Sequence, residues 1–341
     1  MKTQSRTLFA EEFRLEKLST KHDPLERLNA HINWELFRPL LQSVFAKEAK
    51  GAGGRPPYDY VLMFKILILQ RYYNISDEQV EFQILDRLSF MRFLGLGLSD
   101  RVPDHNTVWL FRETITTSGV LEQLFALFTT QLEKQGLLVH EGSIVDASIV
   151  EAPKQRNSRE ENKAIKENTI PATLAENPNV LRHKDVEARW VKKNGVNYFG
   201  YKNHVKVSIK SKFIERYTVT AASLHDSQAL EALVDETNTH CTLYGDSAYS
   251  GESIATMLEQ NAIKNCVHEK GVRNANLTPE QRERNRIKSK VRARVEHVFG
   301  FFEKAMKGSA VATIGLKRAS TAIGLMNLTY NLFRYLHVVQ S

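Results

Sequence analysis

The sequence predicts an α/β fold with a mixed sheet of five strands, preceded by an all-α domain. Two patterns predict it: apolar residues recur at helical spacing over residues 1–135, and from Gly136 onward short β-branched runs alternate with helical patterns. The chain has 341 residues, which is long enough for two domains. We therefore expect a helical domain over 1–135, an α/β domain over 136–310, and a C-terminal helix over 311–341 that packs on the α/β domain.

Composition restricts the class of partner and the compartment. The net charge is +8, which favours a polyanionic partner. Cys241 and Cys266 are too few for a disulfide scaffold, and no Cys/His cluster has the spacing of a zinc site. Residues 1–12 lack the apolar core of a signal peptide, and the most hydrophobic stretch, Val61–Leu69, is too short to span a bilayer. These features predict a reduced, cytosolic setting.

Short helices separated by turns are expected in the first 135 residues. Asp23-Pro24 and the Gly- and Pro-rich segment 51–57 are breaks. Tyr60–Tyr73 is an apolar helix, and Ser76 to Gln79 form a capping box that opens the next one. Such helices, with basic residues between them, suit a helix-turn-helix-like DNA-binding module, and they suit any helical bundle equally well.

The first strands are predicted directly after Gly136. Leu137–Val139 and Ser143–Val150 are apolar and β-branched, and the second has the composition of a strand buried on both faces. Asp146 stands in its middle. A buried carboxylate is unfavourable unless it is paired or bound to a metal, so Asp146 either has a function or lies at a bulge that faces water. Residues 151–195 form a polar insertion, expected to be partly disordered or ordered only on a partner.

Two strands joined by a short turn follow, Phe199–Ile209 and Phe213–Ala222. In the first, apolar and basic residues alternate, which predicts a half-exposed strand with a basic face. From Arg182 to Arg216 there are ten Lys or Arg against three acids. This density favours a surface that follows phosphates over the alternative, a solvated edge strand. The residues expected to contact DNA here are Arg189, Trp190, Lys202 and His204.

Two further aspartates follow strand-like or turn-like segments. Asp246 lies near the end of a predicted short strand, Thr242–Tyr249, and small residues beside it allow the backbone to approach another group closely. Asp226 stands where it would cap a helix that runs to about Thr237, so its position alone explains it. Asp246 has no capping role as clear as that. A fifth strand is expected over Ala262–Val267.

A basic helix is predicted to begin at the capping box 278–281. Every even position from 282 to 294 is basic, a period that spreads charge around the helix, so the segment either frays before Val291 or lies against phosphates. Arg292 and Glu296 are four residues apart and point to the same face. The alternative for this pair is an ordinary surface ion pair. The residues expected against phosphates here are Lys288, Lys290, Arg292 and Arg294.

The order of the predicted elements after Gly136 is that of a ribonuclease-H-like fold. In it, Asp146 lies on the first strand, Asp246 ends the fourth, and Glu296 stands on the last helix, so the three carboxylates are expected to converge. Clustered carboxylates repel, and their oxygens suit Mg²⁺ or Mn²⁺. A pair of such ions can activate a water or a 3′-hydroxyl in phosphoryl transfer. We expect these acids to be both catalytic residues and metal ligands, with Arg292 steering Glu296 or touching the scissile phosphate.

Several segments, in this order, resemble the DDE transposases of bacterial insertion sequences, in the group named for insertion sequence 5. They are Val145–Ser148, Phe199–His204, His225–Ser227, Tyr244–Tyr249 and Arg292–Gly300, and Pro103-Asp104 with Phe111-Arg112 is similar to the end of the family's N-terminal helical domain. The resemblance implies Mg²⁺-dependent cleavage at the terminal inverted repeats of an element and joining of the 3′-hydroxyls to target DNA. It also implies a homodimer or larger assembly that holds two ends together, in the bacterial cytoplasm on nucleoid DNA.

The chain departs from this family at the ends of a longer signature. Relatives often carry a Tyr three residues before the Arg and a Lys seven after the Glu, where this chain has Ser289 and Glu303, with Lys304 one residue further on. The flipped-base and hairpin chemistry of that signature is therefore left open.

Other functions are compatible with parts of the pattern. A DNA-binding regulator would keep the helical domain without catalysis, and the presence of all three acids argues against it. A structure-specific nuclease on the same fold would hydrolyse DNA and never join strands. A glycosidase also uses two carboxylates, but the basic surface and the lack of an aromatic-rich sugar cleft make it a poor fit.

Overall fold

The computed structural model describes residues 10–45, 56–234, 239–271 and 276–339. Contacts within the chain divide it into two units, one of residues 1–120 with 332–341 and one of residues 121–331. The predicted boundary at residue 135 is one helix further along the chain. Across the described ranges, no helix is both long and apolar enough to cross a membrane.

The first unit is helical. Its longest apolar segment, α4, is buried along most of its length and begins at the N-cap Asp59, whose carboxylate accepts from two backbone amides. Arg112 on α7 pairs with Asp77 at the start of α5, with Nη1 at 2.6 Å from Oδ1, and so fixes α5 to α7. The helices are α1 (Ala10–Ser19), α2 (Pro24–His31), η1 (Trp34–Phe37), α3 (Arg38–Phe45), α4 (Tyr60–Tyr73), α5 (Asp77–Asp86), α6 (Leu88–Leu94) and α7 (His105–Ser118).

The second unit is built on a mixed sheet. The strands are β1 (Gly142–Glu151), β2 (Arg189–Lys193), β3 (Val196–Ser208), β4 (Ile214–Ala221), β5 (Thr242–Tyr244) and β6 (Lys264–Asn265). Their order is β2-β3-β1-β5-β6, and β4, which is not on this path, pairs with β3. β1, β2, β3 and β4 pair antiparallel, whereas β5 pairs in parallel with β1 and with β6.

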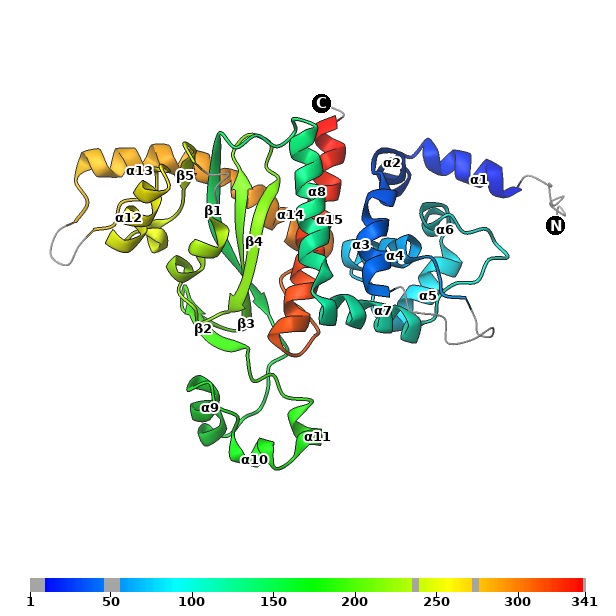
Figure 1. The fold of residues 1–341 in the computed structure, drawn as a ribbon, viewed down its shortest axis with the longest axis horizontal. Coiled ribbons are helices and arrows are strands. Elements are labelled where there is room, and N and C mark those ends of the chain that lie inside the picture. The colour runs from blue at the N-terminus through cyan, green and yellow to red at the C-terminus, as the bar shows by residue number, and fades with distance from the viewer. Residues whose placement is uncertain (1–9, 46–55, 235–238, 272–275, 340–341) are drawn as a thin grey trace, which may run out of the picture. The chain divides into compact units, whose positions relative to one another are not determined.

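Helices cover both faces of this sheet (Figure 1). On one face, Asn327 on α15 exchanges hydrogen bonds with Asn203 on β3. On the other, Val145 belongs to an apolar core shared with Ile254 and Leu258 of α12. The helical segments are α8 (Val120–Lys134), α9 (Arg159–Lys166), α10 (Ala172–Ala175), α11 (Pro178–Leu181), η2 (Asp226–Ala229), η3 (Glu231–Leu233), η5 (Ser247–Tyr249), α12 (Glu252–Gln260), α13 (Pro279–Arg292), η6 (Ala293–Val295), α14 (Glu296–Met306) and α15 (Leu316–Val339).

The sheet has six strands among the described residues, where the sequence predicted five. The additional strand is β2, in the segment predicted as the end of the polar insertion. Asn194 and Gly195 both have positive φ, 51° and 83°, which is the backbone of the type I′ turn that joins closely paired strands. Asn-Gly is the strongest short hairpin signal in a sequence, and our interpretation of 151–195 as a polar insertion overlooked it.

Two other predictions of local structure were wrong, a strand at Leu137–Val139 and a helix after Asp226. The fifth predicted strand is present but shorter, as the two residues of β6. The helix expected after Asp226 is two short 3-10 turns, and its predicted end at Thr237 lies outside the described residues. The segment 151–195 contains three short helices, one of which begins at a capping box formed by Ser158 and Glu161.

The basic face predicted for β3 is buried rather than half-exposed. The side chains of Lys206 and Glu215 are 1% and 2% exposed, and Nζ lies 3.0 Å from Oε2. Glu215 also accepts from Ser143 Oγ at 2.9 Å and lies beside His140. These contacts satisfy charges that would otherwise be costly to bury, so the period-2 alternation on β3 reflects a polar network inside the fold.

Candidate active site

Asp146 occupies the middle of β1, in unbroken register with β3, so the predicted alternative of a bulge is excluded. Its side chain is 18% exposed, and Oδ2 pairs with Arg292 Nη1 at 2.9 Å. Oδ1 accepts from the backbone N of Ala147 at 2.8 Å. Burial raises the pKa of the Asp146 carboxyl to about 6, an effect that Arg292 opposes and Asp246 reinforces. Asp146 is thus a partly desolvated acid beside a second acid.

Asp246 lies next to Asp146 because of the strand register. Ile144 pairs with Tyr244 across parallel strands, and each aspartate follows its member of that pair by two residues. Gly245 makes this close packing possible, since a Cβ there would lie 3.1 Å from Val145. Asp246 also accepts from the N of Ala248 at 2.8 Å and caps η5. Our prediction that Asp246 lacks a clear capping role was therefore wrong.

Glu296 is not assembled with the two aspartates. It is exposed at the start of α14, and no group of three His, Cys, Asp or Glu side chains in the described ranges is placed to hold a metal ion. The residue that does reach Asp146 is Arg292, four positions earlier in the chain. The predicted ion pair of Arg292 is thus with Asp146, not with Glu296.

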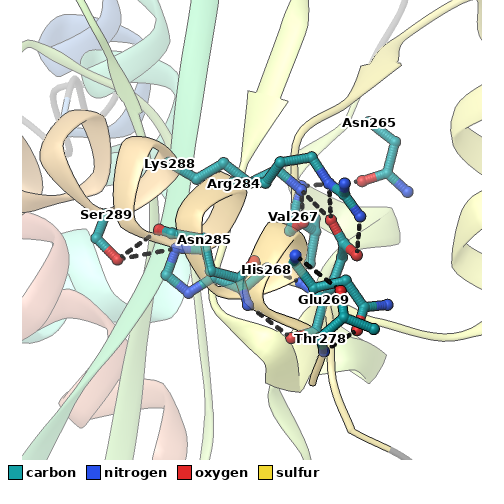
Figure 2. Close-up of polar contacts among 10 residues, drawn as sticks. Asn265, Val267, His268, Glu269, Thr278, Arg284, Asn285, Lys288 and Ser289 are labelled. Atoms are coloured by element: carbon teal, nitrogen blue, oxygen red, sulfur yellow. Dashed lines mark hydrogen bonds and ion pairs between the residues drawn. The ribbon is translucent and has the colours of Figure 1, made fainter.

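A loop after β6 fixes α13, the helix that ends at Arg292 (Figure 2). Arg284 donates to both carboxylate oxygens of Glu269, from Nε at 2.8 Å and from Nη2 at 2.9 Å. Asn285 accepts from the N of Glu269 and donates to its O, both at 2.9 Å. Lys288 Nζ donates to the O of Val267 at 2.8 Å. The Arg284 guanidinium lowers the pKa of the Glu269 carboxyl to about 2, so this acid stays ionised at ordinary pH.

Lys202 and His204, both predicted to contact DNA, face the interior. Lys202 Nζ pairs with Asp226 Oδ1 at 2.7 Å, and His204 Nε2 is 2.9 Å from Thr220 Oγ1. The His204 side chain has no exposed surface. Burial lowers the pKa of the His204 imidazole to about 4, so the ring is uncharged at neutral pH. A neutral, enclosed ring offers nothing to a DNA backbone in this conformation.

Sequence reasoning did not identify two residues beside the acids. Asp226, interpreted as a helix cap, instead pairs with Lys202, and the side chain of His225 caps η2. Tyr249 is fully buried, and its hydroxyl has no hydrogen-bond partner among the described residues. Burial raises the pKa of Tyr249, with Asp226, Asp146 and Asp246 adding to the effect. The sequence signal that could have pointed to Asp226 was its partner Lys202, which stands two residues before His204 on the same strand face.

The remaining predicted DNA contacts lie at the surface or near it. Lys290 and Arg294 are exposed, although Arg294 Nη1 donates to the O of Ile209 at 2.9 Å. Trp190 is 48% exposed and packs against Phe199, with ring centroids 5.2 Å apart. Arg189 Nη2 donates to Asn168 Oδ1 at 2.7 Å. Lys288, held by the O of Val267, is the least available of the group.

Comparisons with known proteins follow the division seen in the contacts. Residues 13–114 match the family model described as Transposase domain (DUF772), and residues 138–332 match the model described as Transposase DDE domain. Among solved structures, the cryo-EM structure of the piggyBac transposase synaptic complex with hairpin DNA matches at 10% identity and a TM-score of 0.46. That match covers 93% of this chain and 75% of the other.

Proposed function

The chain belongs to the DDE transposase family, and we propose that it binds the terminal inverted repeats of an insertion sequence, cleaves the ends and joins the 3′-hydroxyls to target DNA. The observation that carries the proposal is the position of Asp146, in the middle of β1, beside Asp246, which lies two residues past the end of the adjacent strand β5, with the Arg292 guanidinium on Asp146. A carboxylate beside a second carboxylate needs a positive group, and here a side chain supplies it.

The donor set fits Mg²⁺ or Mn²⁺. Hard divalent ions are held by one or two carboxylates together with phosphate oxygens of the substrate, and Asp146 and Asp246 supply two carboxylates. When bound, a pair of such ions activates a water or a 3′-hydroxyl and stabilises the leaving oxygen. Glu296 is our candidate for a third ligand, because it begins α14 only four residues after the Arg292 that already reaches Asp146.

The chain's own groups have separable roles in this scheme. Asp146 and Asp246 would hold the divalent ions that balance the charge of the reacting phosphate. The hydrogen bond that the backbone N of Ala248 donates to Asp246 fixes the rotamer of that side chain. Arg292 neutralises Asp146 before substrate arrives. If the Asp146 carboxylate binds an ion instead, the Arg292 guanidinium becomes free to donate to a phosphate oxygen within its reach.

DNA is expected along the exposed basic residues of the second unit. Lys290 and Arg294 lie directly before Glu296, and Arg189 with Trp190 supplies charge and a stacking surface on β2. The family activity acts on two ends at once, so we propose a homodimer or a larger synaptic assembly. A bacterial origin and the insertion sequence 5 group belong to the same proposal.

The test is a set of single substitutions, Asp146→Asn, Asp246→Asn and Glu296→Gln, assayed on an end-containing duplex with Mg²⁺. Each should abolish cleavage while DNA affinity stays within about tenfold, roughly 1.4 kcal/mol. Glu303→Gln, seven residues after Glu296, is the matched control and should cleave normally. Full cutting by any one of the three variants would remove that residue from the site.

Strand joining separates this proposal from its rivals. A precleaved end with a 3′-hydroxyl should be joined to target DNA by the native protein. A structure-specific nuclease would cut and never join, and a DNA-binding regulator would do neither in the presence of Mg²⁺.

A further inference from the structure

The loop Val267–Glu269 contacts both sides of the candidate active site. Its His268 backbone N donates to the O of Gly245 at 3.0 Å, directly before Asp246. Its other end holds α13 through Glu269, as Figure 2 shows. α13 in turn ends at Arg292, which contacts Asp146. These contacts form a closed path from one catalytic aspartate to the other.

The contacts with α13 fall on one face of the helix. Arg284, Asn285 and Lys288 are spaced at one and four residues, and Arg292 continues that spacing by four more. The face that binds the loop is therefore also the face that presents Arg292. By contrast, Arg286 pairs with Glu283 on its own helix and makes no contact with the loop that the structure describes.

We propose that Glu269 and Asn285 are positioning residues, which set the rotation and height of α13 so that Arg292 meets Asp146. The bidentate Arg284–Glu269 pair fixes the orientation of the two partners, because a planar guanidinium fits a carboxylate in few geometries. The Asn285 amide adds a paired contact to the backbone of residue 269. Together they restrict sliding and rotation of the helix against β6.

This proposal rests on the proposed transposase function for its kinetic part, and it has a structural part that stands alone. Two backbone amides report directly on the contacts of the loop Val267–Glu269. The amide of Glu269 donates to Asn285 Oδ1, and the amide of His268 donates to the O of Gly245. Hydrogen exchange of these amides, measured in the full chain by peptide mass spectrometry, needs neither metal nor DNA.

The experiment compares Glu269→Gln with Glu283→Gln. Both variants remove one carboxylate that is paired bidentately with an arginine of α13, but only Glu269 joins the helix to the loop. In Glu269→Gln, exchange over 267–269 and 284–292 should accelerate at least about fivefold, and Glu283→Gln should match the native protein there. Equal exchange in the two variants would overturn the proposal.

The kinetic arm separates positioning from DNA contact. The maximal cleavage rate of Glu269→Gln should fall about tenfold to a hundredfold while the dissociation constant for the end duplex stays within about twofold. Asn285→Ala, which keeps the ion pair, should reproduce the rate loss with a folded chain if Glu269→Gln is unstable. A matching loss of affinity would assign Glu269 to substrate binding instead. If the native protein cleaves nothing, the proposed function fails, while the exchange result still shows whether Glu269 positions α13.

Discussion

Asp146→Asn is expected to stabilise the metal-free protein although it should abolish cleavage. The pKa of Asp146 rises from 3.8 to about 6 on folding, mainly because the carboxyl is buried. At about 1.4 kcal/mol per pH unit, ionised Asp146 destabilises the fold by up to roughly 3 kcal/mol. Asn has nearly the same shape and no charge, and its Oδ1 can still accept from the N of Ala147. We expect a gain of about 1–3 kcal/mol at pH 8.

The pH dependence has a definite sign. Between the unfolded and folded pKa values the folded state holds more protons, so stability falls as pH rises from about 4 to about 6 and is level above that range. The gain from Asp146→Asn should therefore vanish near pH 4 and reach its maximum above about pH 6.

The assay is thermal or urea unfolding in buffer containing a chelator. For a unit of this size, 1 kcal/mol shifts the midpoint temperature by about 2–4 °C. Asp226→Asn is the matched control, because the Asp226 carboxylate pairs with Lys202 at 2.7 Å and its loss should lower stability. If Asp146→Asn is no more stable than the native protein at pH 8, the assignment of Asp146 as a destabilised buried acid is wrong.

Four further predictions follow from the polar network and the site. Added Mg²⁺ should raise the midpoint of the native protein and leave Asp146→Asn unchanged, and an equal rise in both would remove Asp146 as a ligand. Lys206→Met should cost about 3–5 kcal/mol in urea unfolding by removing the ammonium group that pairs with the buried Glu215, and adding Glu215→Leu should recover most of the loss. Glu215 and Glu133 raise the pKa of His140, so its contribution to stability is present below about pH 6.5 and is lost as pH rises through the higher folded value. His140→Gln should flatten that slope, whereas an unchanged slope would exclude His140 as its source. For DNA binding, Lys290→Gln should reduce the slope of log K against log salt by about 0.9 if Lys290 contacts one phosphate, and an unchanged slope would exclude that contact.

The α/β class and the positions of Asp146 and Asp246 could be predicted because both depend on strong local patterns. Ser143–Val150 is an apolar β-branched run in which one acid stands out, and Thr242–Tyr244 pairs with it as a parallel neighbour. The sequence could not distinguish an exposed basic strand from a buried ionic network on β3. Lys206 alternates with apolar residues in either case, and only its distant partner Glu215 decides between them.

The position of Glu296 depended on geometry that helical spacing does not contain. The i,i+4 relation assumes one continuous helix, whereas α13 ends at Arg292 and α14 begins at Glu296 after the 3-10 turn η6. The relation also could not tell which of the two side chains would face the aspartates. Arg292 has the longer reach and a charge complementary to that of Asp146, and it is the side chain that pairs with Asp146. The predicted convergence of three acids therefore remains a proposal for the metal-bound state.

The helix α15 has a consequence for synthesis of the protein. Its last turns, from Leu332 onward, are grouped with the first unit, where Phe333 stacks on Tyr72 with ring centroids 3.9 Å apart. The core of the N-terminal helices is thus completed only by residues that leave the ribosome more than two hundred positions later. A prematurely terminated chain would lack the closing part of its amino-terminal core, so early stop codons should yield aggregation-prone fragments rather than a free-standing DNA-binding piece.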